Sequence, residues 1–181
     1  MLKQLFIAFL AVVLGSLLGK ILALQKISNR LGRHAAGLLA GATTGSRVKP
    51  ADGFKAATIL FCAAPLGLVG AVTDGLGDYF SPLALKAVMD GLAMTSFVKM
   101  FRWPTALAAI PVFFFFTGLT YIVHTFALPR LASPALLHSV NAAAGLIICA
   151  MTLVILEARR VELANYLPAL FLAPLLTKLF V

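Results

Sequence analysis

The sequence has few charged residues, and very few of these are acidic. Only 12% of its 181 residues are charged, with 15 lysines and arginines against 6 aspartates and glutamates. Hydrophobic residues make up 61% of the chain, and its mean hydropathy is +1.01. A domain folded in water could not bury that much apolar surface. The composition therefore excludes a soluble globule and predicts an integral membrane protein.

Cysteine and the motifs of common enzymes are also scarce. The two cysteines, Cys62 and Cys149, each lie within an apolar run, so no disulfide framework or zinc-binding spacing follows. The histidines His34, His124 and His138 are too scattered to indicate a metal site. The sequence has no phosphate-binding loop, dinucleotide fingerprint or Ser-His-Asp order. We therefore expect no cofactor, no metal and no enzymatic activity.

The basic residues follow a pattern typical of membrane orientation. The formal net charge is +9, but the lysines and arginines lie in connectors between apolar runs and form no basic surface interleaved with aromatic residues. Orientation in the bilayer and contact with anionic lipid explain this pattern better than a nucleic-acid partner. The connectors after the first, third and fifth apolar runs are the most basic. We predict a bacterial inner-membrane protein with these connectors in the cytoplasm and both termini outside.

Six apolar runs approach or exceed the roughly 20 residues that a helix needs to cross a bilayer. They cover residues 5–24, 54–72, 83–101, 103–128, 135–156 and 161 towards the C-terminus. Lys3 and the first run resemble a signal peptide, but no small-x-small cleavage site follows, so we expect a retained helix. The sequence predicts one integral membrane domain over residues 1–181, an all-α polytopic bundle of about six transmembrane helices.

Two features of the first 53 residues have alternative interpretations. The basic connector over residues 25–53 contains a middle segment, 35–42, that is too short to span a bilayer, so it forms either an interfacial helix or a loop rich in glycine and threonine. Gly15 and Gly19 form a Gly-x-x-x-Gly pair, which favours close packing of helices in lipid. Both a helix of the same chain and a second copy of the chain would fit against that pair.

Proline and glycine interrupt the second apolar run. A proline inside a helix removes a backbone donor and clashes with the preceding turn, so we expect a broken helix near Pro65–Gly77. The positions at which we expect the backbone to bend or hinge are Pro65, Gly67, Gly70, Gly75, Gly77, Gly91 and Pro111.

Charged residues lie in or beside apolar sequence after this break. A charged side chain near the centre of a bilayer helix costs roughly 3 kcal/mol, so it normally has a partner or a wet cavity. Lys86 and Asp90 are spaced i, i+4 and share one helix face. Under the predicted orientation, the polar residues of four spans converge in the outer half of the bilayer. The candidate binding residues are Thr73, Asp74, Asp78, Lys86, Asp90, Thr117, His124 and Asn141.

This convergence has three interpretations. In the first, Lys86 neutralises Asp90 while Asp78 and the histidines simply face water outside the membrane. In the second, the polar residues line a wet cavity that is entered from outside and closed by apolar packing on the cytoplasmic side. In the third, the charges pair between two copies of the chain. The sequence leaves all three open.

The same stretch carries a family resemblance that extends over nearly the whole chain. The matching segments are Gly53-Phe54, Leu60-Phe61-Cys62, Gly70, Asp74-Gly75-Leu76, Gly77-Asp78, Lys86, Asp90-Gly91, Ala109-Ile110-Pro111-Val112, Thr117-Gly118 and Leu167-Pro168-Ala169-Leu170. In their order and spacing, these segments resemble the bacterial membrane family called domain of unknown function 554, the YqgA-like proteins. The resemblance implies a multi-helix inner-membrane protein and no established activity. The sequence departs from the family's pattern in two ways. We expect it to begin at the family's third helix, and it has Thr73 where the family generally has glutamine.

Three functions are consistent with these residues. We expect a small-solute or ion transporter or channel, in which Asp74 and Asp90 bind a cation or proton and Lys86 tunes or replaces it. The alternative is a non-catalytic membrane module that packs against a partner subunit or lipid. The expected partners are thus the bilayer, an ion or small solute, and a second copy or a partner subunit.

An intramembrane aspartyl protease is the third and weakest function. Residues 75–78 spell Gly-x-Gly-Asp and residues 168–170 spell Pro-Ala-Leu, as in presenilin-like enzymes. That chemistry needs a second aspartate on the preceding helix, so that two carboxyl groups share a proton. The run over residues 54–72 has no aspartate, which disfavours this function.

Overall fold

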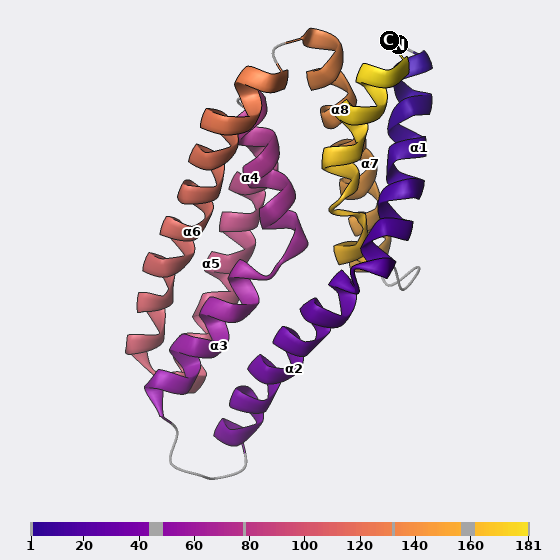
Figure 1. Ribbon diagram of the computed structural model, residues 1–181. Coiled ribbons are helices and arrows are strands. Elements are labelled where there is room, and N and C mark those ends of the chain that lie inside the picture. Colours follow the sequence, from indigo (N-terminus) through magenta and orange to yellow (C-terminus); the bar gives the residue numbers. More distant parts are fainter. Residues whose placement is uncertain (1, 44–48, 78, 132, 157–161, 181) are drawn as a thin grey trace.

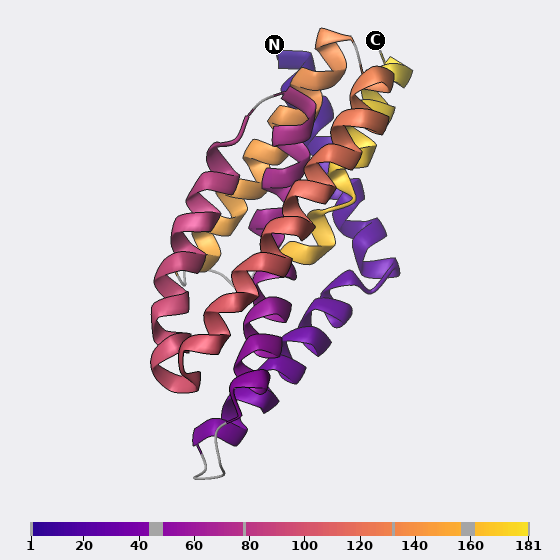
Figure 2. The ribbon, with the colours of Figure 1, turned by 90° about the vertical axis from the view of Figure 1, so that its left-hand side faces the viewer.

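Helices are the only regular elements in residues 2–43, 49–77, 79–131, 133–156 and 162–180, which the computed structural model describes. They form an elongated bundle, and α1 begins at the same end at which α8 stops (Figure 1). The view from the side of α6 shows α5 and α6 close together at their lower ends and diverging towards the upper end of the bundle (Figure 2). The all-α bundle predicted from the sequence is confirmed.

The first two helices meet at a sharp bend. α1 is Leu2–Ile21 and α2 is Leu24–Thr43, and their apolar parts are inclined by 62°. Ala23 between them has φ 53°, a left-handed conformation that costs an L-residue roughly 1–2 kcal/mol and stops the helix. The segment 35–42, for which the sequence allowed a helix or a loop, therefore lies within the 20-residue helix α2, and the loop is wrong. Residues 44–48 lie outside the described residues.

The predicted helix break is confirmed, and it lies just before the proline. α3 is Pro50–Cys62 and α4 is Pro65–Gly77, with a bend of 55° between them. Proline disfavours helical conformation in the residue before it, and it fits the first turn of a helix, where its missing N–H has no partner to lose. The chain therefore breaks before Pro65, and α4 then runs without interruption.

The glycines of α4 are packing positions, and the expectation of hinges there is corrected. Gly67, Gly70 and Gly75 lie inside the continuous helix, where the missing side chains let neighbouring segments approach. A Cβ would lie 2.3 Å from Cζ of Phe116 at Gly67, 2.9 Å from the backbone nitrogen of Leu83 at Gly70, and 2.7 Å from the carbonyl oxygen of Thr120 at Gly75. These contacts hold α5 and α6 against α4.

The second half of the chain runs up and down the bundle. Its elements are α5 (Ser81–Phe101), the 3-10 helix η1 (Trp103–Ala108), α6 (Ala109–Ile122), the π-helix η2 (Val123–Ala127), the 3-10 helix η3 (Leu128–Leu131), α7 (Pro134–Ile155), the 3-10 helix η4 (Leu163–Tyr166) and α8 (Ala169–Phe180). Gly77 is the last residue of α4, and Gly91 lies within the continuous α5. Pro111 lies in the first turn of α6, directly after η1, so neither Gly91 nor Pro111 interrupts an α-helix.

Two groups of helices meet at α4. α1, α7 and α8 pack together in one group, whereas α4 contacts α5, α6 and α7. The Gly-x-x-x-Gly pair of α1 packs within the chain, because a Cβ at Gly15 would lie 2.6 Å from the backbone nitrogen of Ala169, and one at Gly19 would lie 2.1 Å from the carbonyl oxygen of Asn165. In this structure the pair therefore joins α1 to η4 and α8.

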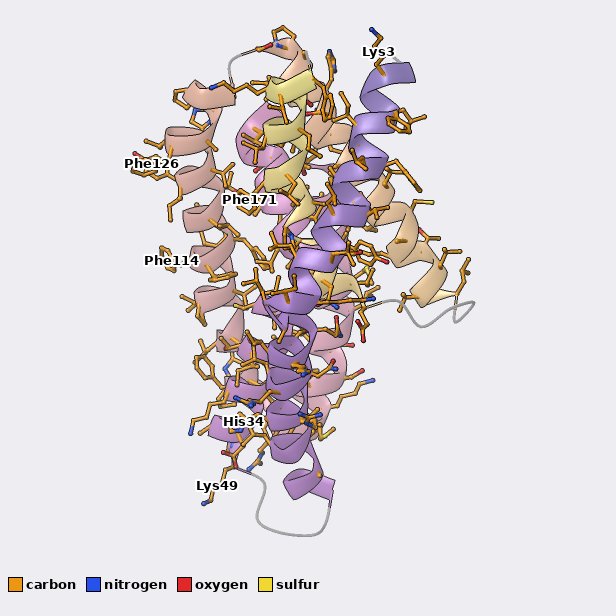
Figure 3. The ribbon with its side chains drawn as sticks, turned by 45° about the vertical axis from the view of Figure 1, so that its right-hand side comes forward. Lys3, His34, Lys49, Phe114, Phe126 and Phe171 are labelled. Carbon is orange, nitrogen blue, oxygen red and sulfur yellow. The ribbon has the colours of Figure 1, made fainter. Side chains whose placement is uncertain are left out.

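Three helices of the described chain are long and apolar enough to cross a membrane, or up to five if each bent pair forms one span. The three are Trp103–Ala127, Pro134–Val154 and Leu163–Phe180. α5 has the length but is not among them, because Lys86, Asp90 and Lys99 lower its hydropathy. The six runs expected from the sequence thus correspond to three to five candidate spans. Large apolar side chains such as Phe114 and Phe126 point away from the bundle (Figure 3), as a lipid-facing surface requires.

Candidate functional site

A cavity of about 660 Å³ lies between α4, α5 and α6, and Phe61 of α3 reaches it from below the break. Most of its wall is carbon. The side chains that line it are Phe61, Asp74, Phe80, Leu83, Ala84, Lys86, Ala87, Asp90, Met94, Ala109, Val112, Phe113, Phe116, Thr117 and Thr120, together with Gly91. Four of the candidate binding residues from the sequence are among them.

Lys86 and Asp90 form an ion pair on the cavity wall. Both lie on α5, one helical turn apart, and the Lys86 ammonium donates a hydrogen bond to Oδ2 of Asp90. Lys86 is 4% exposed, whereas the Asp90 side chain keeps 19% of its surface exposed. This is the pairing within one chain that the first of the three interpretations describes. The second carboxylate oxygen, Oδ1, has no hydrogen-bond or ion-pair partner among the described residues.

Two aromatic rings surround the buried ammonium. Lys86 Nζ lies 5.4 Å from the ring centroid of Phe61 and 5.8 Å from that of Phe116. Both distances are within the range in which a ring face attracts a cation. Gly67 makes the second contact possible, because its missing side chain leaves room for the Phe116 ring. The lysine is thus held by a carboxylate and two rings from three different helices.

Asp74 contributes a second carboxylate from the opposite wall. It follows Gly67 and Gly70 at helical spacing (i, i+3, i+7), so the three positions share the face of α4 that meets α5 and α6. Within the described part of the chain, the Asp74 carboxylate accepts no hydrogen bond and has no ion-pair partner. Thr120 is nearby on α6, and its hydroxyl donates to the Ala71 carbonyl oxygen at 3.3 Å.

The other sequence candidates lie elsewhere. Thr73 is fully buried and binds backbone: its hydroxyl lies 3.0 Å from the Gly70 carbonyl oxygen and 3.3 Å from that of Tyr79, which ties the end of α4 to the start of the next segment. His124 on η2 and Asn141 on α7 are exposed and line no part of the cavity. Asp78 lies outside the described residues. The structure therefore brings candidates from α4, α5 and α6 together at one cavity and leaves the α7 candidate outside it.

The aromatic lining is the part that sequence reasoning missed. Phe61 and Phe116 are both 7% exposed and flank the lysine, and Phe80 and Phe113 lie at the mouth. The sequence holds 14 phenylalanines, and no local pattern distinguishes these four from the others. Only the packing of α3 against α5 and α6 brings them to one cavity.

The apolar outer surface, the candidate spans and the buried ion pair together define a polytopic α-helical membrane protein. Residues 1–178 match the family described as "Protein of unknown function (DUF554)", and the chain belongs to this family. The resemblance recognised in the sequence is confirmed.

Two relatives match most of the chain. "Uncharacterized protein YqgA" of Escherichia coli (strain K12) is 30% identical over 169 residues, which cover 91% of this chain and 69% of that protein. "Uncharacterized membrane protein YdfK" of Bacillus subtilis (strain 168) is 27% identical over 170 residues, covering 94% of this chain and 68% of the relative. No solved structure matches the chain.

Proposed function

We propose that this protein binds a small solute or ion in the cavity between α4, α5 and α6 and moves it across the bacterial inner membrane. The observation that carries the proposal is the Lys86–Asp90 pair on the wall of a largely apolar cavity, where the lysine is buried and the aspartate is partly exposed. Ionisable residues inside membrane helices are costly, and they typically mark the paths of ions and solutes.

The pair is poorly explained as a stabilising element alone. Replacing a buried ion pair by well-packed apolar residues is often neutral or stabilising by about 1–4 kcal/mol, so stability gives little reason to place one there. This pair also borders open space, because Asp90 is partly exposed and no described residue donates a hydrogen bond to its Oδ1. A solute in the cavity could therefore contact the carboxylate directly.

The position of the pair along α5 supports a site near one membrane surface. Lys86 lies five residues after Ser81, which corresponds to about 8 Å along the helix axis. Lys3 lies towards the end at which α5 begins, and His34 and Lys49 lie towards the opposite end (Figure 3). With the basic connectors in the cytoplasm, both termini and the cavity belong to the outer half of the membrane, as we propose.

Flux measurements on purified protein in liposomes test this function. The liposomes are screened for uptake of cations, anions and uncharged small solutes. We expect flux for one class, and we expect Asp90→Asn to abolish it because the solute loses a carboxylate. Asp52→Asn, which removes the same charge in the first turn of α3 away from the cavity, is the matched control.

A second variant separates function from folding. Asp90→Asn leaves Lys86 buried without its partner, so we pair it with the double variant Lys86→Met/Asp90→Leu, in which neither charge remains. Loss of flux in a folded double variant supports the proposal. If no solute moves, or if flux is unchanged in both variants, the protein is better described as a non-catalytic membrane module that packs with lipid or a partner subunit.

A further inference from the structure

The charges that line the cavity do not balance. The carboxylate of Asp90 is neutralised by Lys86, which leaves the carboxylate of Asp74 as the one charged lining group without a partner among the described residues. An unpaired carboxylate beside apolar surface is unfavourable, because the low-dielectric surroundings replace water poorly. A bound positive charge would remove that cost, whereas a bound negative charge would add to it.

The aromatic lining has the same preference. Phe80 and Phe113 line the cavity and are 64% and 65% exposed, so much of their ring surface is uncovered. The face of a ring carries partial negative charge and attracts ammonium groups, as the Lys86 ammonium between Phe61 and Phe116 already shows within the chain. An anion gains nothing from these faces.

The size and the surface of the cavity favour an organic ligand. A volume of about 660 Å³ is within the range of roughly 300–1,000 Å³ that is typical of small-molecule sites. Bare metal cations need several oxygen ligands in contact with the ion, whereas most of the atoms on this wall are the carbons of Leu83, Met94 and Val112, among others. The wall is suited to an apolar body that carries one charged group.

We propose that the solute is an amphiphilic organic monocation, with its cationic group against Asp74 and its apolar body in the cavity between α5 and α6. This inference rests on the proposed function, since it names the class of solute that would be moved. Asp74 lies three residues before the end of α4, about 5 Å along the helix axis. The cation therefore binds close to the outer end of the cavity, and the Lys86–Asp90 pair lies deeper along α5.

Calorimetric binding to the full chain in lipid nanodiscs tests the charge of the ligand. The probes are trimethylphenylammonium, its neutral carbon isostere tert-butylbenzene and the anion benzenesulfonate, with empty nanodiscs as the blank for partitioning into lipid. We expect the cation to bind at least tenfold more tightly than the isostere, and the anion to bind more weakly than both. Equal binding of cation and isostere, preference for the anion, or no binding by any probe would overturn the inference.

Variants of Asp74 test the assigned contact. The probe has no N–H to donate, so its contact with Asp74 is an attraction between opposite charges, and Asp74→Asn should weaken cation binding roughly 10- to 100-fold and leave the neutral isostere unaffected. Asp74→Glu should retain the preference for the cation, because it keeps the charge. Asp52→Asn should leave binding unchanged. Cation binding that is insensitive to Asp74→Asn in a folded protein would overturn the assignment.

The two proposals fail in different ways. If a neutral or anionic solute moves in liposomes and its flux depends on Asp90, the transport proposal stands and the cationic class is overturned. If trimethylphenylammonium binds at Asp74 but no solute crosses the membrane, the site stands and transport is overturned.

Discussion

Removing either member of the Lys86–Asp90 pair should destabilise the protein strongly, whereas removing both should not. Lys86→Met leaves the Asp90 carboxylate in an apolar cavity, and Asp90→Leu leaves an ammonium whose side chain is only 5% exposed. Breaking a buried pair in this way costs roughly 3–5 kcal/mol. We expect the lower end of that range, because the Asp90 side chain is 19% exposed and the rings of Phe61 and Phe116 remain beside the lysine.

The attraction between the two charges gives a similar magnitude. Two unit charges about 4 Å apart attract each other by about 4 kcal/mol at an effective dielectric constant of about 20. In the double variant Lys86→Met/Asp90→Leu neither charge needs a partner, and both new side chains are apolar and of comparable length. Its free energy of unfolding should therefore lie within about 1.5 kcal/mol of the wild-type value.

Reversible unfolding in mixed detergent micelles measures these differences. A denaturing alkyl sulfate detergent is titrated into micelles of a mild detergent that hold the folded protein. The fluorescence of Trp103, the only tryptophan of the sequence, reports the folded fraction. The two single variants and the double variant form a cycle in which the losses do not add. A double variant that loses the sum of the two single losses, or single variants that each lose less than about 1 kcal/mol, would refute the view that the pair is buried and mutually dependent.

Three further predictions concern packing and orientation. Gly19→Ala should lower the free energy of unfolding by about 3 kcal/mol, since its Cβ would lie 2.1 Å from a carbonyl oxygen of η4. Gly37→Ala should raise the free energy of unfolding by about 0.5–1 kcal/mol, because no heavy atom lies within 4 Å of its Cβ. Equal effects of the two variants in the same detergent titration would contradict the close contact between α1 and η4. Thr105→Val should raise the same free energy by about 1 kcal/mol, because the buried Thr105 hydroxyl has no hydrogen-bond partner within the described residues; a loss of similar size would mean that the hydroxyl is bonded. Orientation can be tested with single-cysteine variants in a background without the native cysteines. A membrane-impermeant maleimide added to spheroplasts should modify Lys3→Cys directly, but should modify Lys49→Cys only after the membrane is permeabilised. The reverse labelling pattern would invert the proposed orientation.

Several features of the candidate site follow from local sequence. The i, i+4 spacing of Lys86 and Asp90 brings the two side chains together on any α-helix, because the geometry of one turn is the same in every fold. The helix break near Pro65 follows in the same way, from a backbone nitrogen without a hydrogen and a clash with the preceding residue. Such predictions need only the neighbouring residues, so they hold before the tertiary structure is known.

Other features depend on which helices meet. The sequence could not show that Asp74 shares a cavity with the Lys86–Asp90 pair while Asn141 does not. Asp74 and Asn141 lie on helices of similar hydropathy, so hydropathy does not distinguish them. The small residues of α4 decide this, since Gly67 and Gly70 allow α5 and α6 to pack on the face that carries Asp74. Glycines that resemble hinges in a linear sequence are contact points once a neighbouring backbone is present.

The sequence by itself determined that this protein is a helical membrane bundle and that one lysine and one aspartate share a face of α5. Composition sets the first, because apolar surface on this scale requires lipid, and the helix repeat sets the second. The tertiary structure alone decided that Phe61 and Phe116 enclose the lysine and that Asp74 lines the same cavity without a partner among the described residues. These contacts join residues that are far apart in the chain, and close packing between helices determines them, which no local pattern encodes.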